Sequence, residues 1–185
     1  MPNNKITILG IDPGSVFCGY GVITKESNKL TVVEYGVVRA KLKFEDLNLR
    51  LKEIYNRITE VIIRTKPDES AFETMFYAKN AQSLMKLSHA RAVAVLASVN
   101  KDIPIFEYSP REVKKSVTGR GAAGKEQVQF MIKTLLGIKE ETGLFDATDA
   151  LAVAVCHALK RTTAKSQGKS WADFVKNNPG RVVKS

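Results

Sequence analysis

The feature that most constrains this chain is a carboxylate at the end of an apolar strand near the N-terminus. The apolar run over residues 6–11 is short enough for a buried strand, and the Asp-Pro-Gly sequence that begins at Asp12 stops it. A second apolar segment at 20–23 follows closely, which predicts a hairpin. Because an unpaired buried charge is costly, Asp12 requires a cation, a cluster of donors or water. The simpler alternative is an Asx-turn, in which this side chain binds the backbone of Gly14 or Ser15.

The remaining sequence alternates between short apolar runs and helical periodicity. Further strands are expected at 30–39, 70–75 and 104–108. Helices are expected at 44–65, at 78–99, from Ser109-Pro110 onward, at 125–136 and at 146–161. This order predicts an α/β fold with a mixed five-stranded sheet flanked by helices. We expect one domain over residues 1–162, and we expect the segment 163–185, where the periodicity is lost, to be a basic C-terminal extension or a disordered tail.

The chain is strongly basic. Its formal net charge is +10, and the segment 163–185 supplies +4 of this, so the body of the protein is basic as well. Such an excess favours a polyanionic partner such as nucleic acid, and simple solubility is the alternative. We expect no membrane association, because no apolar run approaches the ~20 residues that cross a bilayer. Cys18 and Cys156 lack a paired spacing and no signal peptide is evident, so a reduced, cytoplasmic protein is expected.

Three more acidic residues stand against their surroundings. Glu73 lies inside a short apolar strand, and Asp146 and Asp149 share one face of a helix at a spacing of i and i+3. Helix capping and compensation of the helix dipole would explain Asp146 well but Asp149 less well. Together with Asp12, these acids point to hard cations, and Mg²⁺ prefers such oxygen ligands. Two ions about 4 Å apart can activate a water and stabilise a leaving oxygen in phosphoryl displacement.

Three motifs carry a resemblance to a known family. They are ILGIDPG at 8–14, Phe72-Glu73 with Phe76-x-Ala-Lys-Asn80, and DATDA at 146–150, and they resemble the RuvC-type Holliday junction resolvases in kind and order. The likeness runs from about residue 6 to residue 159. It implies a ribonuclease H-like fold, and it implies that Asp12, Glu73, Asp146 and Asp149 are the metal-binding catalytic residues.

The same resemblance implies an activity and partners. A homodimer of this family nicks two strands of like polarity in a four-way DNA junction, during recombination and repair, and leaves 5′-phosphate and 3′-hydroxyl ends. The expected cofactor is Mg²⁺, with two ions per active site and Mn²⁺ as a substitute. A branch-migration helicase complex is the expected partner. The helix at 78–99, rich in small and apolar residues, is expected to supply much of the dimer contact.

Candidate DNA-binding residues surround the acids. Phe76 is expected to stack on an unpaired base, although an ordinary core phenylalanine has the same spacing. A flexible glycine-rich loop at 119–124 is surrounded by basic residues that can reach phosphates: Lys114, Lys115, Arg120 and Lys125. Any one of these lysines is more often a solvated surface group. Lys79 and Arg91 are weaker candidates.

Two other patterns are rejected as sites. Residues 119–125 resemble a P-loop, but Glu126 replaces the hydroxyl residue that would hold Mg²⁺, and no clear buried strand precedes the loop. His89 and His157 are isolated in helices, so each is expected to be a structural histidine. His157 lies two turns after Asp149, which leaves open a role behind the metal ligands.

Three other functions compete with junction resolution. A nuclease of the same fold that acts on RNA–DNA hybrids or structured RNA would share the acids but not the run at 76–80. An actin-like ATPase or sugar kinase would need a second domain that 185 residues cannot hold. A binding protein with a decayed site is disfavoured because all four acids are present.

Overall fold

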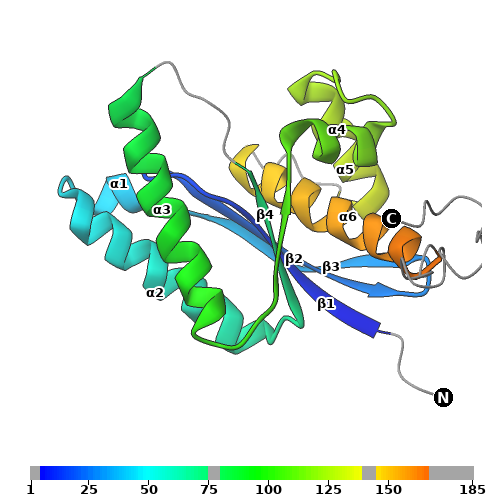
Figure 1. The fold of residues 1–185 in the computed structure, drawn as a ribbon, viewed down its shortest axis with the longest axis horizontal. Coiled ribbons are helices and arrows are strands. Elements are labelled where there is room, and N and C mark those ends of the chain that lie inside the picture. Colours follow the sequence, from blue (N-terminus) through cyan, green and yellow to red (C-terminus); the bar gives the residue numbers. More distant parts are fainter. Residues whose placement is uncertain (1–4, 75–79, 139–144, 167–185) are drawn as a thin grey trace, which may run out of the picture.

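The protein is a single sheet with helices on both faces (Figure 1). The computed structural model describes residues 5–74, 80–138 and 145–166. The strands are β1 (Lys5–Asp12), β2 (Cys18–Glu26), β3 (Lys29–Val38), β4 (Glu69–Glu73) and β5 (Ile105–Tyr108). The helices are α1 (Ala40–Lys43), α2 (Leu47–Thr65), α3 (Ala81–Val99), α4 (Pro110–Thr118), α5 (Lys125–Leu136) and α6 (Phe145–Ser166). The expected mixed five-stranded α/β architecture is confirmed.

The first strand lies in the middle of the sheet. The strand order is β3-β2-β1-β4-β5. β1 pairs with β2 in antiparallel fashion and with β4 in parallel fashion, and β4 pairs with β5 in parallel fashion. Parallel neighbours end at the same edge of a sheet, so the C-terminal ends of β1, β4 and β5 lie together. Asp12 and Glu73 are the last residues of β1 and β4, and this topology brings them to one edge.

The sheet is buried on both faces. Along β1, Ile6 and Ile8 face a core that α4, α5 and α6 cover. Leu9 and Ile11 point the other way, into a core that α2 and α3 complete. This alternation explains why the first strand reads as a continuous apolar run rather than as alternating apolar and polar residues.

Glycines let α6 lie directly on the sheet. A Cβ at Gly10 would come within 2.2 Å of the Ala150 carbonyl oxygen. At Gly19 it would come within 2.0 Å of the Asp146 carbonyl oxygen. No side chain fits at such distances, so these glycines set the close approach of the N-terminal half of α6 to β1 and β2.

Several boundaries differ from the sequence-based expectation. The helix expected from residue 44 begins at Leu47, because Asp46 accepts a hydrogen bond from the Leu49 N–H and caps α2. The short helix α1 before it was not expected. Helix α6 continues to Ser166, beyond the expected end at Arg161. The division into a domain over 1–162 and an extension over 163–185 remains a prediction.

Other boundaries agree closely with the expectation. A capping box formed by Ser109 and Glu112 starts α4 as predicted. Asn80 caps α3, and residues 78 and 79, where that helix was expected to begin, lie outside the described residues. Within the parts of the chain that the structure describes, no helix is both long and apolar enough to span a bilayer.

Candidate active site

Four acidic residues from three elements occupy one end of the sheet. Asp12 ends β1, Glu73 ends the parallel neighbour β4, and Asp146 and Asp149 lie in the first turns of α6. The register pairs Asp12 with Gly19, the residue on which the Asp146 backbone rests. The fold therefore brings together the four acids that the sequence singled out.

The carboxylates influence one another. The pKa of Asp12 is raised from 3.8 to about 7, mainly by burial and then by the negative charges of Asp149, Glu73 and Asp146, whereas Lys125 opposes the shift. Within the described residues the Asp12 carboxylate accepts no hydrogen bond, so the Asx-turn considered as an alternative does not form. A half-buried carboxylate without a donor, facing three others, calls for a cation.

One cation already lies among these acids. The Lys125 ammonium is 2.7 Å from Asp149 Oδ2, and this contact with the Asp149 carboxylate raises the pKa of Lys125. The pKa of Asp149 is nevertheless raised, because burial outweighs the lysine. Burial likewise raises the pKa of Glu73, with the charge of Asp149 as the next cause, against the opposing charges of Lys114 and Lys125. The positive charge present is too small for the acids that surround it.

The acids border a pocket of about 170 Å³. Its charged lining consists of Glu73, Asp149, Lys114 and Lys125, and its apolar lining comes from α4, α5 and α6. A lining that combines acids with lysines suits a substrate in which a phosphate lies beside a metal-bound oxygen.

The donor set fits a hard divalent cation in its chemistry. All four candidate ligands are carboxylates, and burial first, with the charges of neighbouring acids after it, raises the pKa values of Asp12, Glu73 and Asp149. As the side chains are placed, no three acids, histidines or cysteines of the described residues converge in a geometry that would hold an ion. Asp149 instead turns to Lys125. An ion bound here would compete with Lys125 for the charge of the Asp149 carboxylate.

The basic residues predicted to contact DNA divide into two pairs. Lys114 and Lys125 line the pocket with the acids. Lys115 and Arg120 are exposed and do not line it. Phe76 and Lys79 lie outside the described residues. Arg91 forms an ion pair with Glu107 and lies over the Phe72 ring, 5.9 Å from its centroid, which favours a structural role for this side chain.

The two rejected patterns are settled by their surroundings. The loop at 119–124 follows helix α4 rather than a strand, as expected for a sequence that is not a P-loop. His157 is a structural histidine, as predicted, because its two ring nitrogens contact the Tyr108 hydroxyl at 2.6 Å and the Glu69 carboxylate at 2.5 Å. These partners leave it no contact with the four acids. His89 is exposed on α3, so the expectation of a structural histidine is wrong there.

The sequence reasoning missed the glycines that position α6. Gly10, Gly19 and Gly21 would each clash with α6 if they carried a side chain. The sequence did contain a sign of this close approach: β2 carries Gly19 and Gly21, and β1 carries Gly10, which pairs with Gly21. Glycine inside a strand often marks the close approach of another backbone.

Comparison with known proteins extends over most of the chain. The family model described as crossover junction endodeoxyribonuclease RuvC matches residues 8–157. The crossover junction endodeoxyribonuclease RuvC of Porphyromonas gingivalis is 44% identical, with 98% of each chain covered. That of Cytophaga hutchinsonii is 43% identical over 95% of this chain and 87% of its own.

Two solved structures have the same fold. Thermus thermophilus RuvC in complex with Holliday junction substrate superposes with a TM-score of 0.80 at 31% identity, covering 86% of this chain and 96% of that one. The yeast mitochondrial Holliday junction resolvase Ydc2 gives a TM-score of 0.64 at 15% identity, covering 92% of this chain and 85% of that one, and so supports the fold alone. The expected ribonuclease H-like architecture is confirmed.

Proposed function

Since this chain belongs to the RuvC family of crossover junction endodeoxyribonucleases, we propose that it resolves four-way DNA junctions with the acidic pocket as its active site. The observation that carries the assignment is that the fold brings Asp12, Glu73, Asp146 and Asp149 to one end of the sheet, where the largely buried Asp12 carboxylate has no hydrogen-bond donor among the described residues. The proposed reaction is hydrolysis of one phosphodiester in each of two strands of like polarity, with 5′-phosphate and 3′-hydroxyl products.

Asp12, Glu73, Asp146 and Asp149 are the proposed ligands of two Mg²⁺ ions, with Mn²⁺ as a substitute. Bound ions of this kind supply Lewis-acid stabilisation of the leaving oxygen and lower the pKa of a water. Asp12 contributes by its central position, since the other three acids each act on its charge. An ion at Asp149 would weaken the contact of this carboxylate with Lys125, and Lys125 would then be free to contact the scissile region.

The two lysines of the pocket are proposed to hold the phosphate backbone. Lys114 reaches the pocket from α4, and Lys125 reaches it from the first turn of α5. Each opposes the negative charge of Glu73. Their charges attract a phosphodiester that the four acids alone would repel. Phe76 remains the proposed base-stacking residue, and Lys79, Lys115 and Arg120 remain proposed phosphate contacts beyond the pocket.

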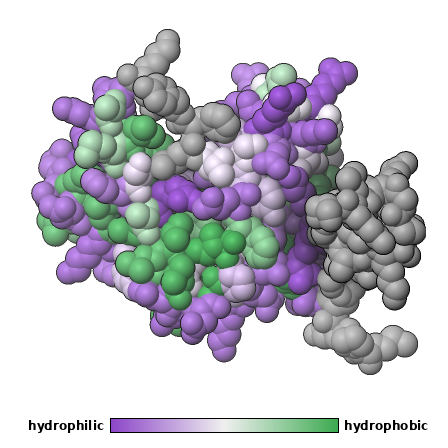
Figure 2. All heavy atoms as spheres, in the orientation of Figure 1, coloured by the Kyte–Doolittle hydropathy of each residue, from purple (hydrophilic) through white to green (hydrophobic). Residues whose placement is uncertain are grey.

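We also propose a homodimer through the outer face of α3. Figure 2 shows hydrophobic residues gathered on the side of the molecule that α3 presents. Met85, Leu96 and Val99 on α3 are each about half exposed. A two-fold contact here would place one active site on each of two strands. A branch-migration helicase partner and a cytoplasmic location are proposed from the resemblance.

Val99→Glu tests that interface, because Val99 is 52% exposed and its replacement leaves the core intact. Sedimentation should show a dimer for the wild-type protein and a monomer for this variant. Ala94, on the same helix, is fully buried against the subunit's own core, so a glutamate there would unfold the chain instead. A wild-type monomer that still cuts both strands in concert would contradict the dimer.

One assay separates the junction resolvase from its competitors. The protein is incubated with Mg²⁺ and labelled four-way junction, linear duplex, RNA–DNA hybrid or ATP. Paired, symmetric nicks in the junction, with linear duplex left intact, are expected. Preferred cutting of the hybrid would favour the RNA-directed nuclease, ATP hydrolysis would favour the kinase-like alternative, and binding without cutting would favour a decayed site.

A further inference from the structure

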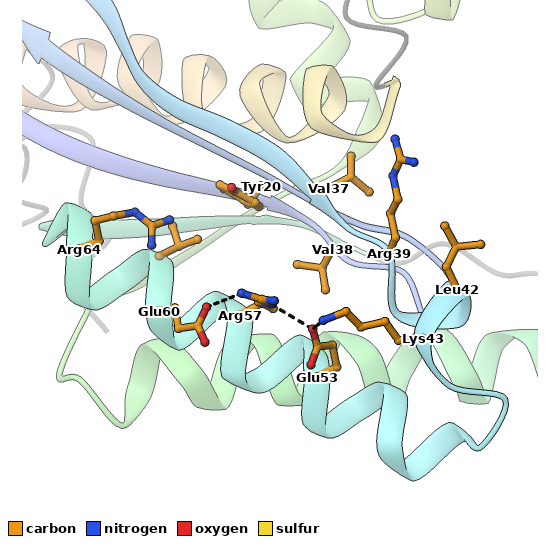
Figure 3. A pocket seen from close by; sticks show the side chains of 11 residues that line it. Tyr20, Val37, Val38, Arg39, Leu42, Lys43, Glu53, Arg57, Glu60 and Arg64 are labelled. Carbon is orange, nitrogen blue, oxygen red and sulfur yellow. Dashed lines mark hydrogen bonds and ion pairs between the residues drawn. The ribbon is translucent and has the colours of Figure 1, made fainter.

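A second, larger cavity lies between the end of β3, α1 and α2 (Figure 3). It has a volume of about 470 Å³ and opens to solvent. Four cations line it, Arg39, Lys43, Arg57 and Arg64, together with the two carboxylates Glu53 and Glu60. The lining of the cavity therefore has a net positive charge. The four acids of the candidate active site do not line this cavity.

The carboxylates of the cavity hold two of the cations in place. Glu53 Oε1 accepts from Lys43 Nζ at 2.6 Å and from Arg57 Nε at 3.0 Å, and the Arg57 guanidinium also contacts Glu60 at 2.9 Å (Figure 3). The Glu53 side chain is only 15% exposed, and the Lys43 contact lowers its pKa. Glu53 thus holds the Lys43 ammonium in place beside Arg57. A cation that is already ordered loses little freedom when an anion binds.

Arg39 differs from the other three cations. Arg64 is engaged by Glu34 at 2.5 Å, whereas Arg39 is exposed and has no partner among the described residues. It stands at the N-cap of α1 but makes no side-chain cap there. Its charge is available to a ligand, and its removal would disturb no described contact.

The cavity is joined to the catalytic end of the sheet. Val38, the last residue of β3, pairs with Cys18 at the start of β2. The Lys41 N–H donates to the Val16 carbonyl oxygen at 3.4 Å, so α1 rests on the loop that connects Asp12 to Cys18. The acidic pocket lies on the face of the sheet that α4, α5 and α6 cover, and the basic cavity lies on the face that α2 covers. The loop after Asp12 joins the two faces at this end of the sheet.

We propose that this cavity is a second DNA subsite, in which Arg39 and Lys43 bind the phosphate backbone of a junction arm that leads away from the active site. The inference rests on the proposed function. The net positive charge of the cavity and the contact of α1 with the loop after Asp12 favour DNA over an acidic protein segment, because a polyanion bound at the catalytic end of the sheet can continue around that loop to the cavity. Leu42, 70% exposed at the rim, offers apolar contact to a sugar.

The first test is the salt dependence of DNA binding in EDTA, where no cutting occurs. Arg39→Ala and Lys43→Gln should each reduce the slope of log affinity against log salt by about 1, as expected for the loss of one phosphate contact. Arg39→Lys, which keeps the charge, should restore the slope. Lys29→Ala is the control, because Lys29 is an exposed cation at the opposite end of β3. Its slope should equal that of the wild type.

The second test locates the contact on the DNA. Methylphosphonates that neutralise single phosphates along a junction arm should weaken wild-type binding at a position outside the cleavage site. Arg39→Ala should lose its sensitivity at that position alone. Slopes and interference patterns that match the wild type would overturn the proposal and leave an acidic protein segment as the occupant. Since binding is scored apart from cutting, a wild-type protein that fails to nick junctions would count against the proposed function and not against the cavity.

Discussion

Helix α6 and strand β4 carry charged residues at both of their ends, and these charges have opposite environments at the two ends. Where β4 begins, Glu69 contacts His157 at 2.5 Å and Arg161 at 3.0 Å, both on α6. Where β4 ends, Glu73 faces Asp149 of the same helix. One end therefore pairs each charge with an opposite or neutral partner, whereas the other collects like charges.

The difference separates charges that stabilise the fold from charges that the fold must tolerate. The cluster at Glu69 continues through His157 to Tyr108 on β5, and Lys25 Nζ donates to the Ala158 carbonyl oxygen at 2.5 Å, so polar groups there tie three strands to the helix. At the other end the pKa of Asp12 is raised to about 7, which means that its charge opposes folding at neutral pH. A destabilising cluster is retained when its charge is used for binding or catalysis.

The largest expected effect is the loss of cleavage when a charge is removed from the like-charged end. Asp12→Asn and Glu73→Gln each remove a proposed metal ligand at nearly constant shape, so nicking of a four-way junction should fall by orders of magnitude. Affinity for the junction in EDTA should hold or rise slightly, because the lysines remain and a repelling charge is gone. Glu69→Gln is the control at the paired end. Cutting by a folded Asp12→Asn protein at the wild-type rate would contradict the site.

A smaller effect, on stability rather than on chemistry, is expected at the paired end. Glu69→Ala leaves His157 and Arg161 without their carboxylate, and removal of one partner from a largely buried cluster costs about 2–4 kcal/mol. Urea denaturation should show this loss, whereas cleavage per folded molecule should stay near the wild-type value. A Glu69→Ala protein as stable as the wild type, or one that is folded but inactive, would contradict the claim that the Glu69 end serves stability and the Asp12 end serves cleavage.

The sequence predicted the acidic end far better than the paired end. Asp12 and Glu73 were recognisable because each interrupts an apolar strand, and such an interruption needs an explanation. Glu69 and Arg161 sit at the margins of their elements, where charged residues are ordinary, so nothing marked them as partners 92 residues apart in the chain. The basic cavity escaped notice for the same reason, since Arg39, Glu53 and Arg57 meet only through the packing of α1 and α2.

The core strands and the long helices were also predictable from the sequence, because hydrophobic periodicity is set by local sequence. The ends of the helices were harder to predict. The start of α2 depends on which acid, Glu45 or Asp46, caps it, and only the observed hydrogen bond from the Leu49 N–H decides this. The depth to which α6 sinks onto the sheet depends on three glycines, whose meaning appears only when strand register is known.

The smallest expected effect is a pH dependence of the paired end. Burial lowers the pKa of His157 below 6.5, against the opposing influence of Glu69. As the pH falls through about 6.5, the unfolded chain takes up this proton before the folded protein does. The unfolded state then binds more protons, so the free energy of unfolding decreases toward acid. His157→Gln should lose less stability than the wild type between pH 7.5 and pH 5.5, and equal losses would argue against the assignment.

The central claim is that the charge at Asp12 destabilises the fold and binds a cation. Thermal unfolding of the wild type and of Asp12→Asn at pH 8, each in EDTA and in Mg²⁺, tests this claim most directly. In EDTA the variant should melt higher, because the shift of the Asp12 pKa from 3.8 to about 7 corresponds to at most about 4 kcal/mol. In Mg²⁺ the gap between the two proteins should narrow, since an ion at 100 times its Kd adds about 2.7 kcal/mol to the wild type alone. Identical melting temperatures for the two proteins, with the same response to Mg²⁺, would contradict it.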